Sequence, residues 1–456
     1  MESEQQLERG LKNRHVQLIA IGGAIGTGLF LGSGKSIHLA GPSILLAYLI
    51  TGAICFLIMR ALGELLLSNL NYHSFVDFVG DYLGDAFAFV TGWTYWFCWV
   101  CIAMADLTAV GMYIQFWFPT VPQWVPGLIC LVILVAMNLA TVKLFGEMEF
   151  WFALIKIIAI LALIVVGIVL IFKGVEAGGT KASFSNLWNH GFFANGINGF
   201  VLSFQMVVFA FVGIELVGLT AGETADPENV IPSAINNIPI RILIFYIGAL
   251  AVIMSIYPWN QVDPTASPFV KVFAVIGITG AASVVNFVVL TSAASACNSG
   301  VFSTSRMIFS LAKEGDAPKP FSKLTKNKVP ANALYFSAGV VTVSVILNYA
   351  IPSAATVFTL ITSVSTVCFI YIWGITVICH LKYRKTRPEL AAKNKFKMPL
   401  YPVSNYIILA FLAFVLVVLG LADDTRFALF VTPVWFIGLI ICYKLKKPKT
   451  NSQEAK

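Results

Sequence analysis

Residues 19–30 of this 456-residue chain read IAIGGAIGTGLF and place four glycines within seven positions of an apolar run. A glycine inside a helix costs about 1 kcal/mol relative to alanine. We therefore expect a helix in this region to open locally rather than continue unbroken. The alternative is a close-packing surface, because Gly22 and Gly26 have the spacing at which small residues let two membrane helices approach.

A second interrupted run lies at residues 209–218, which read FAFVGIELVG and place two glycines and the carboxyl group of Glu215 in an apolar segment. Glycine-interrupted spans at corresponding places in two halves of a chain are typical of the binding site of secondary transporters. The start of a half-helix attracts a carboxylate, and the carbonyls freed by a break attract an ammonium group. Two such breaks match both ends of a free amino acid and favour the transporter interpretation over close packing.

The composition is that of a membrane protein: 58% of the residues are hydrophobic and only 11% are charged. Soluble domains carry about 25% charged residues, so an ordinary soluble enzyme and a disordered chain are both excluded. A bilayer is crossed by about 20 apolar residues in a helix. We predict an all-α membrane protein with twelve transmembrane helices, at residues 16–35, 41–67, 86–118, 124–142, 150–172, 199–221, 238–257, 272–311, 333–350, 354–381, 405–421 and 427–445.

The broken spans are the first and the sixth, which suits five helices followed by five inverted ones, with two more appended. The predicted domains are a cytoplasmic N-terminal segment, a transport core of ten helices with their loops, helices 11 and 12, and a cytoplasmic tail, at residues 1–15, 16–400, 401–445 and 446–456.

Basic residues cluster on one predicted side of the membrane. Five lysines fall in the loop after the eighth span, seven lysines or arginines follow the tenth span, and four lysines lie within residues 444–449. Cytoplasmic loops carry such an excess, so we expect both termini in the cytoplasm and the chain in the cytoplasmic membrane. This placement, rather than a nucleic-acid surface, accounts for the net charge of +8, and no nucleic-acid partner is expected.

Reactive-group motifs are few. All eight cysteines fall within predicted spans, and the C-x-x-C formed by Cys98 and Cys101 is interpreted as a buried apolar pair. The sequence has no phosphate-binding loop, and its five scattered histidines form no catalytic pattern. We therefore expect no enzyme activity, no catalytic residue, no cofactor and no metal.

Ionisable residues within the spans require a reason, because a charge in the membrane centre costs about 3 kcal/mol or more. Lys156 and Glu215 are the candidates for proton coupling; the alternatives are a lysine that reaches the membrane surface and a glutamate that only ties the broken helix. Arg60 and Glu64 have i,i+4 spacing and are expected to form a structural pair. Asp106 is expected near the outer end of the third span in a structural role.

Several strings resemble the amino acid–polyamine–organocation superfamily, and within it the bacterial amino acid transporter family, over nearly the whole chain. The strings lie at residues 13–30, 59–65, 92–96 and 145–153. Two further stretches, residues 292–307 and 423–426, are similar to family members that carry D-serine, D-alanine and glycine. The resemblance implies a leucine-transporter-like 5+5 inverted repeat and proton-driven uptake of free amino acids.

The resemblance also implies the site residues. The substrate carboxylate would lie against residues of the first span: Ala24, Ile25, Gly26, Thr27 and Gly28. The amine and side chain would lie against residues of the sixth span: Phe209, Ala210, Phe211, Gly213 and Ile214. Lys156 matches a lysine at the position of sodium in sodium-coupled relatives, and Glu215 matches the sixth-span glutamate of the family.

The expected cargo is a small neutral amino acid together with a proton: glycine, D-alanine or D-serine, with L-alanine and L-serine as close competitors. Permeases for proline or for L-serine and L-threonine share these motifs and stay open, as does an exchanger on the same fold. A transporter-like amino acid sensor is the alternative of a different class. The expected partners are the substrate, the proton and membrane lipids.

Overall fold

The computed structural model describes residues 25–70, 72, 74–139, 142–216, 226–277 and 279–446. Nearly all ordered segments are helices, and the short strands β1 (Glu176–Ala177) and β2 (Thr180–Lys181) pair as one antiparallel hairpin. The helices of the first half are α2 (Thr27–Phe30), α3 (Gly32–Ala40), α4 (Ile44–Ser68), α5 (Phe75–Leu83), α6 (Asp85–Gln115), α7 (Trp124–Asn138), α8 (Val142–Lys173), α9 (Asn186–Asn189) and α10 (Gly196–Phe209).

The second half is also helical. Its elements are α12 (Pro227–Asn236), α13 (Ile238–Arg241), a π-helical stretch (Ile242–Gly248), α14 (Ala249–Ile256), α15 (Pro268–Val275), α16 (Thr279–Lys313), α17 (Ala331–Ala350), α18 (Ala354–Thr386), α19 (Pro388–Lys393), α20 (Val403–Leu421) and α21 (Phe427–Leu445). Single 3-10 turns lie at Gly41–Ser43, Trp259–Gln261 and Lys319–Ser322.

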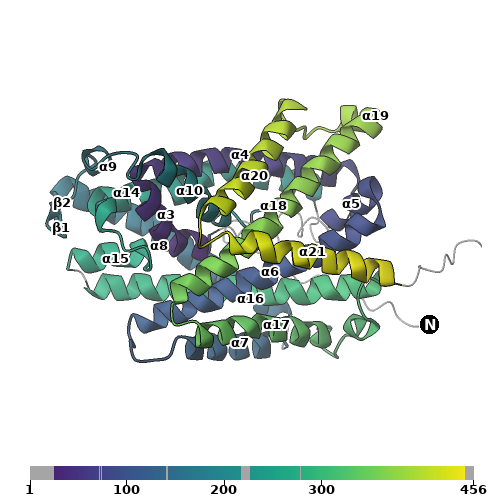
Figure 1. Cartoon of the computed structure of the whole chain (residues 1–456), viewed down its shortest axis with the longest axis horizontal. Helices are drawn as coiled ribbons and strands as arrows, with labels where there is room; N and C mark the ends of the chain where they lie inside the picture. The colour runs from purple at the N-terminus through teal and green to yellow at the C-terminus, as the bar shows by residue number, and fades with distance from the viewer. Residues whose placement is uncertain are drawn as a thin grey trace, which may run out of the picture.

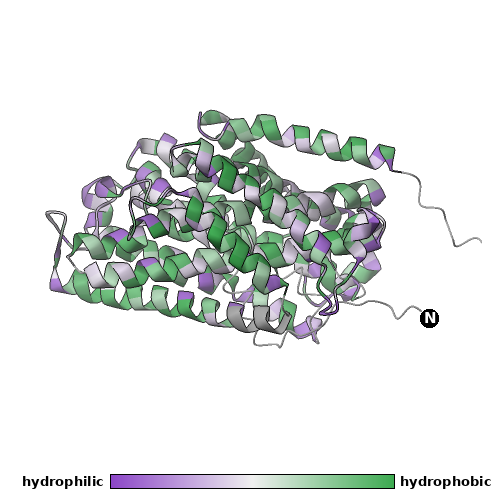
Figure 2. Ribbon diagram, turned by 90° about the horizontal axis from the view of Figure 1, so that it is seen from below, coloured by the Kyte–Doolittle hydropathy of each residue, from purple (hydrophilic) through white to green (hydrophobic). Residues whose placement is uncertain are grey.

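Within the described part of the chain, nine helical segments are long and apolar enough to cross a membrane. Of two shorter apolar helices, α7 falls within the predicted fourth span and α10 overlaps the predicted sixth span. The long helices are apolar over most of their length, and the hydrophilic residues gather mainly in loops and at helix ends (Figure 2). These features support a multi-pass membrane protein.

Several predicted helix bounds differ from the structure, and two of the differences lie at glycines. The first helical run continues to Ala40 rather than ending at residue 35, and Gly41, with φ +59°, turns it into α4. The predicted span 272–311 is divided, because α15 ends at Val275 and α16 begins only at Thr279. Gly277 lies between them with φ +80°, a backbone conformation that glycine adopts readily and other residues rarely adopt.

Helix α8 shows how the surface divides between lipid and protein. A stripe of large apolar side chains at seven-residue intervals is exposed: Trp151, Ile158, Val165 and Phe172. The opposite stripe is buried and includes Ala153, Lys156, Ile160 and Leu163. An exposed apolar stripe on a long helix suits contact with lipid chains.

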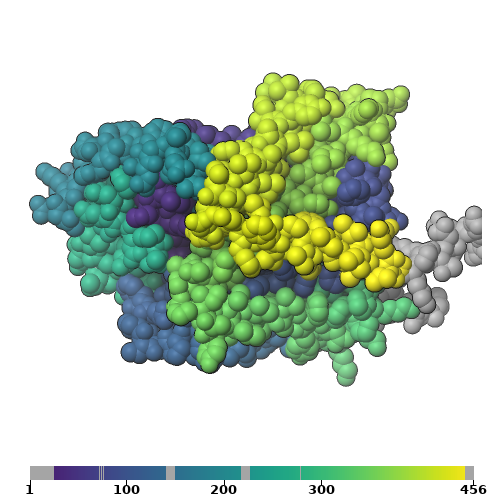
Figure 3. All heavy atoms as spheres, in the orientation of Figure 1, coloured from purple at the N-terminus to yellow at the C-terminus, as the bar shows by residue number. Residues whose placement is uncertain are grey.

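The centre of the molecule is built around α6, which packs against α16 and α18 (Figure 1). The C-terminal helices α20 and α21 lie on the outside of this arrangement and cover part of one face (Figure 3). Helices α2 and α10 contact each other, and α2 also contacts α6 and α16. The two predicted breaks therefore meet at the core.

Candidate functional site

The sixth predicted span is broken in the structure. Helix α10 ends at Phe209, residues 210–215 form turns, and Gly213 has φ +96°. The hydroxyl of Tyr246 donates to the freed carbonyl of Ala210 at 3.1 Å. The N–H of Gly213 donates to the Glu215 carboxylate at 3.2 Å. The Glu215 carboxylate within the break and the Tyr246 hydroxyl from the π-helical stretch therefore bond two of the backbone groups that the break exposes.

The first break is described from Ile25 onward, and Gly22, Gly23 and Ala24 lie outside the described residues. Gly26 is extended, with φ −132° and ψ −161°, and α2 begins at Thr27. The Ile25 carbonyl accepts hydrogen bonds from Lys156 Nζ at 3.4 Å and from Ser292 Oγ at 3.5 Å. Because the first N–H groups of a helix have no acceptor within it, the start of α2 offers donors to a bound anion.

The two breaks approach each other closely at Gly28. A Cβ atom placed on Gly28 would lie 2.7 Å from the Ala210 Cα atom and 3.1 Å from the Ala210 nitrogen. Such distances are shorter than real Cβ contacts, and backbone atoms cannot rotate away. Glycine at this position is therefore what lets α2 lie against the end of α10.

A small cavity of about 40 Å³ lies between the breaks. This volume holds roughly three water molecules. Its walls come from both breaks and from α6, α8 and α16, through Gly26, Thr27, Gly28, Trp99, Ile102, Asp106, Glu149, Ala153, Lys156, Phe209, Ala210, Val212, Leu216, Ala296 and Ser299.

Three ionisable side chains line this cavity. Asp106 Oδ1 accepts a hydrogen bond from Thr27 Oγ1 at 2.8 Å. Glu149 accepts from Ser295 Oγ at 2.7 Å and from Ser299 Oγ. Lys156 is 2% exposed and contacts the first break, so it does not reach for the membrane surface.

The comparisons with known proteins agree on one family. Residues 15–456 match the model described as "Amino acid permease". The chain belongs to the amino acid permease family. Its relatives are named as transporters or permeases, and the protein is not an enzyme.

Two relatives come from Bacillus subtilis (strain 168). The permease is 75% identical to the transporter YdgF over 98% of this chain and 97% of that protein. It is 71% identical to the amino-acid permease AapA over 97% of this chain and 96% of that protein. A third relative, the D-serine/D-alanine/glycine transporter of Escherichia coli (strain K12), is 58% identical over 96% of this chain and 93% of that protein.

Several site residues predicted for the permease lie outside the cavity lining. Phe211 points into the aromatic core, where its ring stacks on Tyr246 with 4.9 Å between centroids. Gly213 shapes the turn, and Ile214 is buried without lining the cavity. Glu215 is buried and faces Tyr95, whose hydroxyl lies 3.5 Å from Oε1.

Sequence reasoning missed two of the cavity's acids. Asp106 was expected in a structural role, but its side chain lines the cavity from the last third of α6. Glu149 lies in the string at residues 145–153 that resembles the family, where nothing marks it as part of a site. Its seven-residue spacing from Lys156 places both on one face of α8 and is the signal that could have found it.

Two larger cavities, of about 410 and 460 Å³, lie beyond Leu31, which lines both. Lys35 and Asp424 form an ion pair at 2.5 Å across the larger one and thereby join α3 to the loop between α20 and α21. Leu31 directly follows α2, so both cavities lie next to the first break of the permease.

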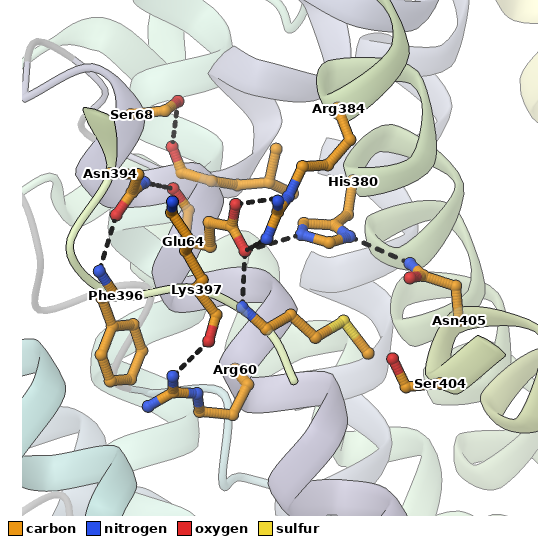
Figure 4. Close-up of polar contacts among 12 residues, drawn as sticks. Arg60, Glu64, Ser68, His380, Arg384, Asn394, Phe396, Lys397, Ser404 and Asn405 are labelled. Atoms are coloured by element: carbon orange, nitrogen blue, oxygen red, sulfur yellow. Dashed lines mark hydrogen bonds and ion pairs between the residues drawn. The ribbon is translucent and has the colours of Figure 1, made fainter. Parts of the chain in front are cut away.

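A second cluster of buried charge lies around Glu64 (Figure 4). Its carboxylate is fully buried and pairs with Arg384 at 2.7 Å and with the His380 ring at 3.0 Å. The N–H of Met398 also donates to it at 2.6 Å. The cluster ties α4 to α18 and to the segment before α20.

The expected Arg60–Glu64 pair is therefore not the main contact of either residue. Arg60 instead donates to Asn236 at 3.1 Å and to the Lys397 carbonyl, and its guanidinium lies 3.8 Å from the centre of the Phe396 ring. Both residues have long-range partners, and both contribute to structure rather than to the cavity.

Proposed function

We propose that this protein is a proton-coupled permease that imports small neutral amino acids across the cytoplasmic membrane. The proposed substrates are glycine, D-alanine and D-serine, with L-alanine and L-serine as competitors. The observation that carries the proposal is the cavity in which the start of α2 faces the end of α10. Peptide N–H groups on one side and carbonyls on the other suit the two ends of a zwitterion.

The substrate carboxylate would lie against the peptide groups of residues 24–28, and the amine and side chain against Phe209 and Ala210. The turn that contains Phe211, Gly213 and Ile214 would set the position of this second wall. Gly28 lets the two walls meet closely at one side of the cavity.

Size supports the small-substrate proposal. The cavity of about 40 Å³ is partly walled by the large side chains of Trp99 and Phe209, so a short substrate side chain requires less rearrangement than a long one. The Escherichia coli relative is named for D-serine, D-alanine and glycine, which all have side chains of two heavy atoms or fewer. A permease for proline or for L-serine and L-threonine remains the second candidate, because the same backbone contacts serve any α-amino acid.

Coupling to protons is proposed through Lys156 and Glu215. Lys156 bonds the first break, and Glu215 bonds the second, so a proton gained or lost at either changes the contacts of a broken helix. An exchanger would use the same cavity without a net proton movement.

The finer architecture is part of the proposal. It has twelve transmembrane helices, ten of them in a 5+5 inverted repeat over residues 16–400 and two within 401–445. The segments 1–15 and 446–456 would both lie in the cytoplasm.

Uptake of radiolabelled D-alanine into proteoliposomes tests the proposal. Glycine and D-serine are expected to compete strongly, and L-phenylalanine is expected not to compete. A protonophore should abolish accumulation, and replacement of sodium by choline should leave it unchanged. Strong inhibition by phenylalanine without inhibition by glycine would overturn the substrate class, while survival with a protonophore and loss without sodium would overturn the coupling. Binding without any uptake would indicate a sensor.

A further inference from the structure

Asp106 has an unused acceptor in the central cavity. The residue is 1% exposed, and its Oδ1 atom accepts the hydrogen bond from Thr27. Its Oδ2 atom has no hydrogen-bond partner among the described residues. A buried carboxylate oxygen without a donor is costly, and such atoms in native proteins require an explanation.

The second acid of the cavity does not share this feature. Both Glu149 oxygens accept hydrogen bonds, one from Ser295 and one from Ser299. Asp106 is therefore the acid of this cavity that has an oxygen to offer a cationic group of a ligand.

Position decides which part of a substrate meets Asp106. Its partner Thr27 belongs to the segment that, in the proposed function, holds the substrate carboxylate. One carbon atom separates the carboxylate from the ammonium group in an α-amino acid. A ligand anchored at residues 26–28 therefore places its ammonium within reach of a side chain bonded to Thr27.

We propose that Asp106 binds the substrate ammonium group directly through Oδ2, while the hydrogen bond from the Thr27 hydroxyl to Oδ1 fixes the Asp106 carboxylate beside the first break. This inference rests on the proposed function and adds a residue to it. An ammonium group has three donors and suits an ionised acceptor. Asp106 would thereby reject small hydroxy acids, which share the substrate's carboxylate and size but carry no positive charge.

Competition binding with tritiated glycine on the purified full-length protein tests this role. Two unlabelled competitors are compared: glycine, and glycolate, in which a hydroxyl group replaces the ammonium. In the wild type glycolate is expected to compete far more weakly. Removal of one partner from a buried charged hydrogen bond weakens binding roughly 30-fold to 4,000-fold. In Asp106→Asn the affinity for glycine should fall by such a factor. The ratio of the glycolate inhibition constant to the glycine inhibition constant (the glycolate-to-glycine ratio) should therefore move towards one.

Glu149→Gln is the matched control, because it removes a carboxylate charge from the same cavity at a residue whose oxygens are already used. Its glycolate-to-glycine ratio should stay near that of the wild type. An unchanged ratio in Asp106→Asn, or an equal fall of the ratio in both variants, overturns the proposal. If the wild type binds no glycine, D-alanine or D-serine, the proposed function itself has failed.

A measurement on the wild type covers the case in which Asp106→Asn does not fold. Solid-state NMR with ¹⁵N-glycine and protein labelled with ¹³C at aspartate carboxyl carbons reports whether the two nuclei lie within about 4 Å, the span of a direct hydrogen bond plus one covalent bond. Dephasing of one aspartate carboxyl signal by bound glycine supports the assignment. Saturating glycine with no dephased aspartate signal refutes it.

Discussion

Replacement by alanine of two glycines of the first break, Gly28 and Gly26, should affect stability in one case and transport in the other. In Gly28→Ala the new methyl group would lie 2.7 Å from Ala210 Cα and 3.1 Å from Phe209 Cδ1. Over-packing of this kind costs about 1–3 kcal/mol, and the upper part of this range applies because the nearest atoms are backbone atoms. At roughly 1 °C per kcal/mol for a chain of 456 residues, the thermal unfolding midpoint should fall by roughly 2–3 °C.

In Gly26→Ala the added Cβ atom has no neighbour within 4 Å, and the extended backbone of Gly26 is open to any residue. The unfolding midpoint should stay near that of the wild type. The methyl group would instead take space at the cavity wall, and one methyl group changes discrimination in a tight pocket by about 10–200-fold. Uptake should fall more for D-serine than for glycine, because the larger substrate needs the lost volume.

Thermal unfolding of both variants in detergent, followed by uptake of labelled glycine and D-serine in proteoliposomes, separates the two effects. The reasoning is refuted if Gly28→Ala is as stable as the wild type, or if Gly26→Ala transports D-serine and glycine with unchanged relative rates.

Three further variants test other parts of the account. Glu64→Gln removes a buried charge that faces Arg384 and should lower the free energy of unfolding by about 3–5 kcal/mol. The double variant with Arg384→Gln should lose less stability than the sum of the two single variants. Additive losses in chemical denaturation would show that the pair is not coupled. Lys156→Ala should abolish proton-driven accumulation in proteoliposomes while leaving a folded protein, and full accumulation would count against a coupling role. Asp424→Asn breaks a half-exposed pair with Lys35 and should change stability by no more than about 1 kcal/mol; a larger loss would mean that this contact holds the fold together.

The features that could be predicted well from the sequence are those where a residue is energetically costly inside an apolar helix. Glycines and an ionisable residue inside apolar runs are costly, so they mark positions where the fold uses them. The break after Phe209, the extended Gly26 and the inward-facing Lys156 all follow this logic. The family could be inferred in the same way from long strings around these positions.

The features that could not be predicted depend on contacts between distant segments. Glu64 has Arg60 within one helical turn but pairs with Arg384, 320 residues away. Asp106 lies in an apolar helix, and only its contact with Thr27 reveals that it faces the cavity. Phe211 faces the aromatic core rather than the cavity, because the turn after α10 decides its direction. Sequence spacing cannot follow a side chain through an irregular turn.

The central claim is that an amino acid binds between the two broken helices. An electron cryo-microscopy map of the full-length permease in nanodiscs with saturating D-alanine tests it most directly. The account predicts ligand density between the backbone at Gly26–Gly28 and the end of α10 at Phe209 and Ala210. Density elsewhere, or continuous helices through both segments with no ligand between them, would contradict it.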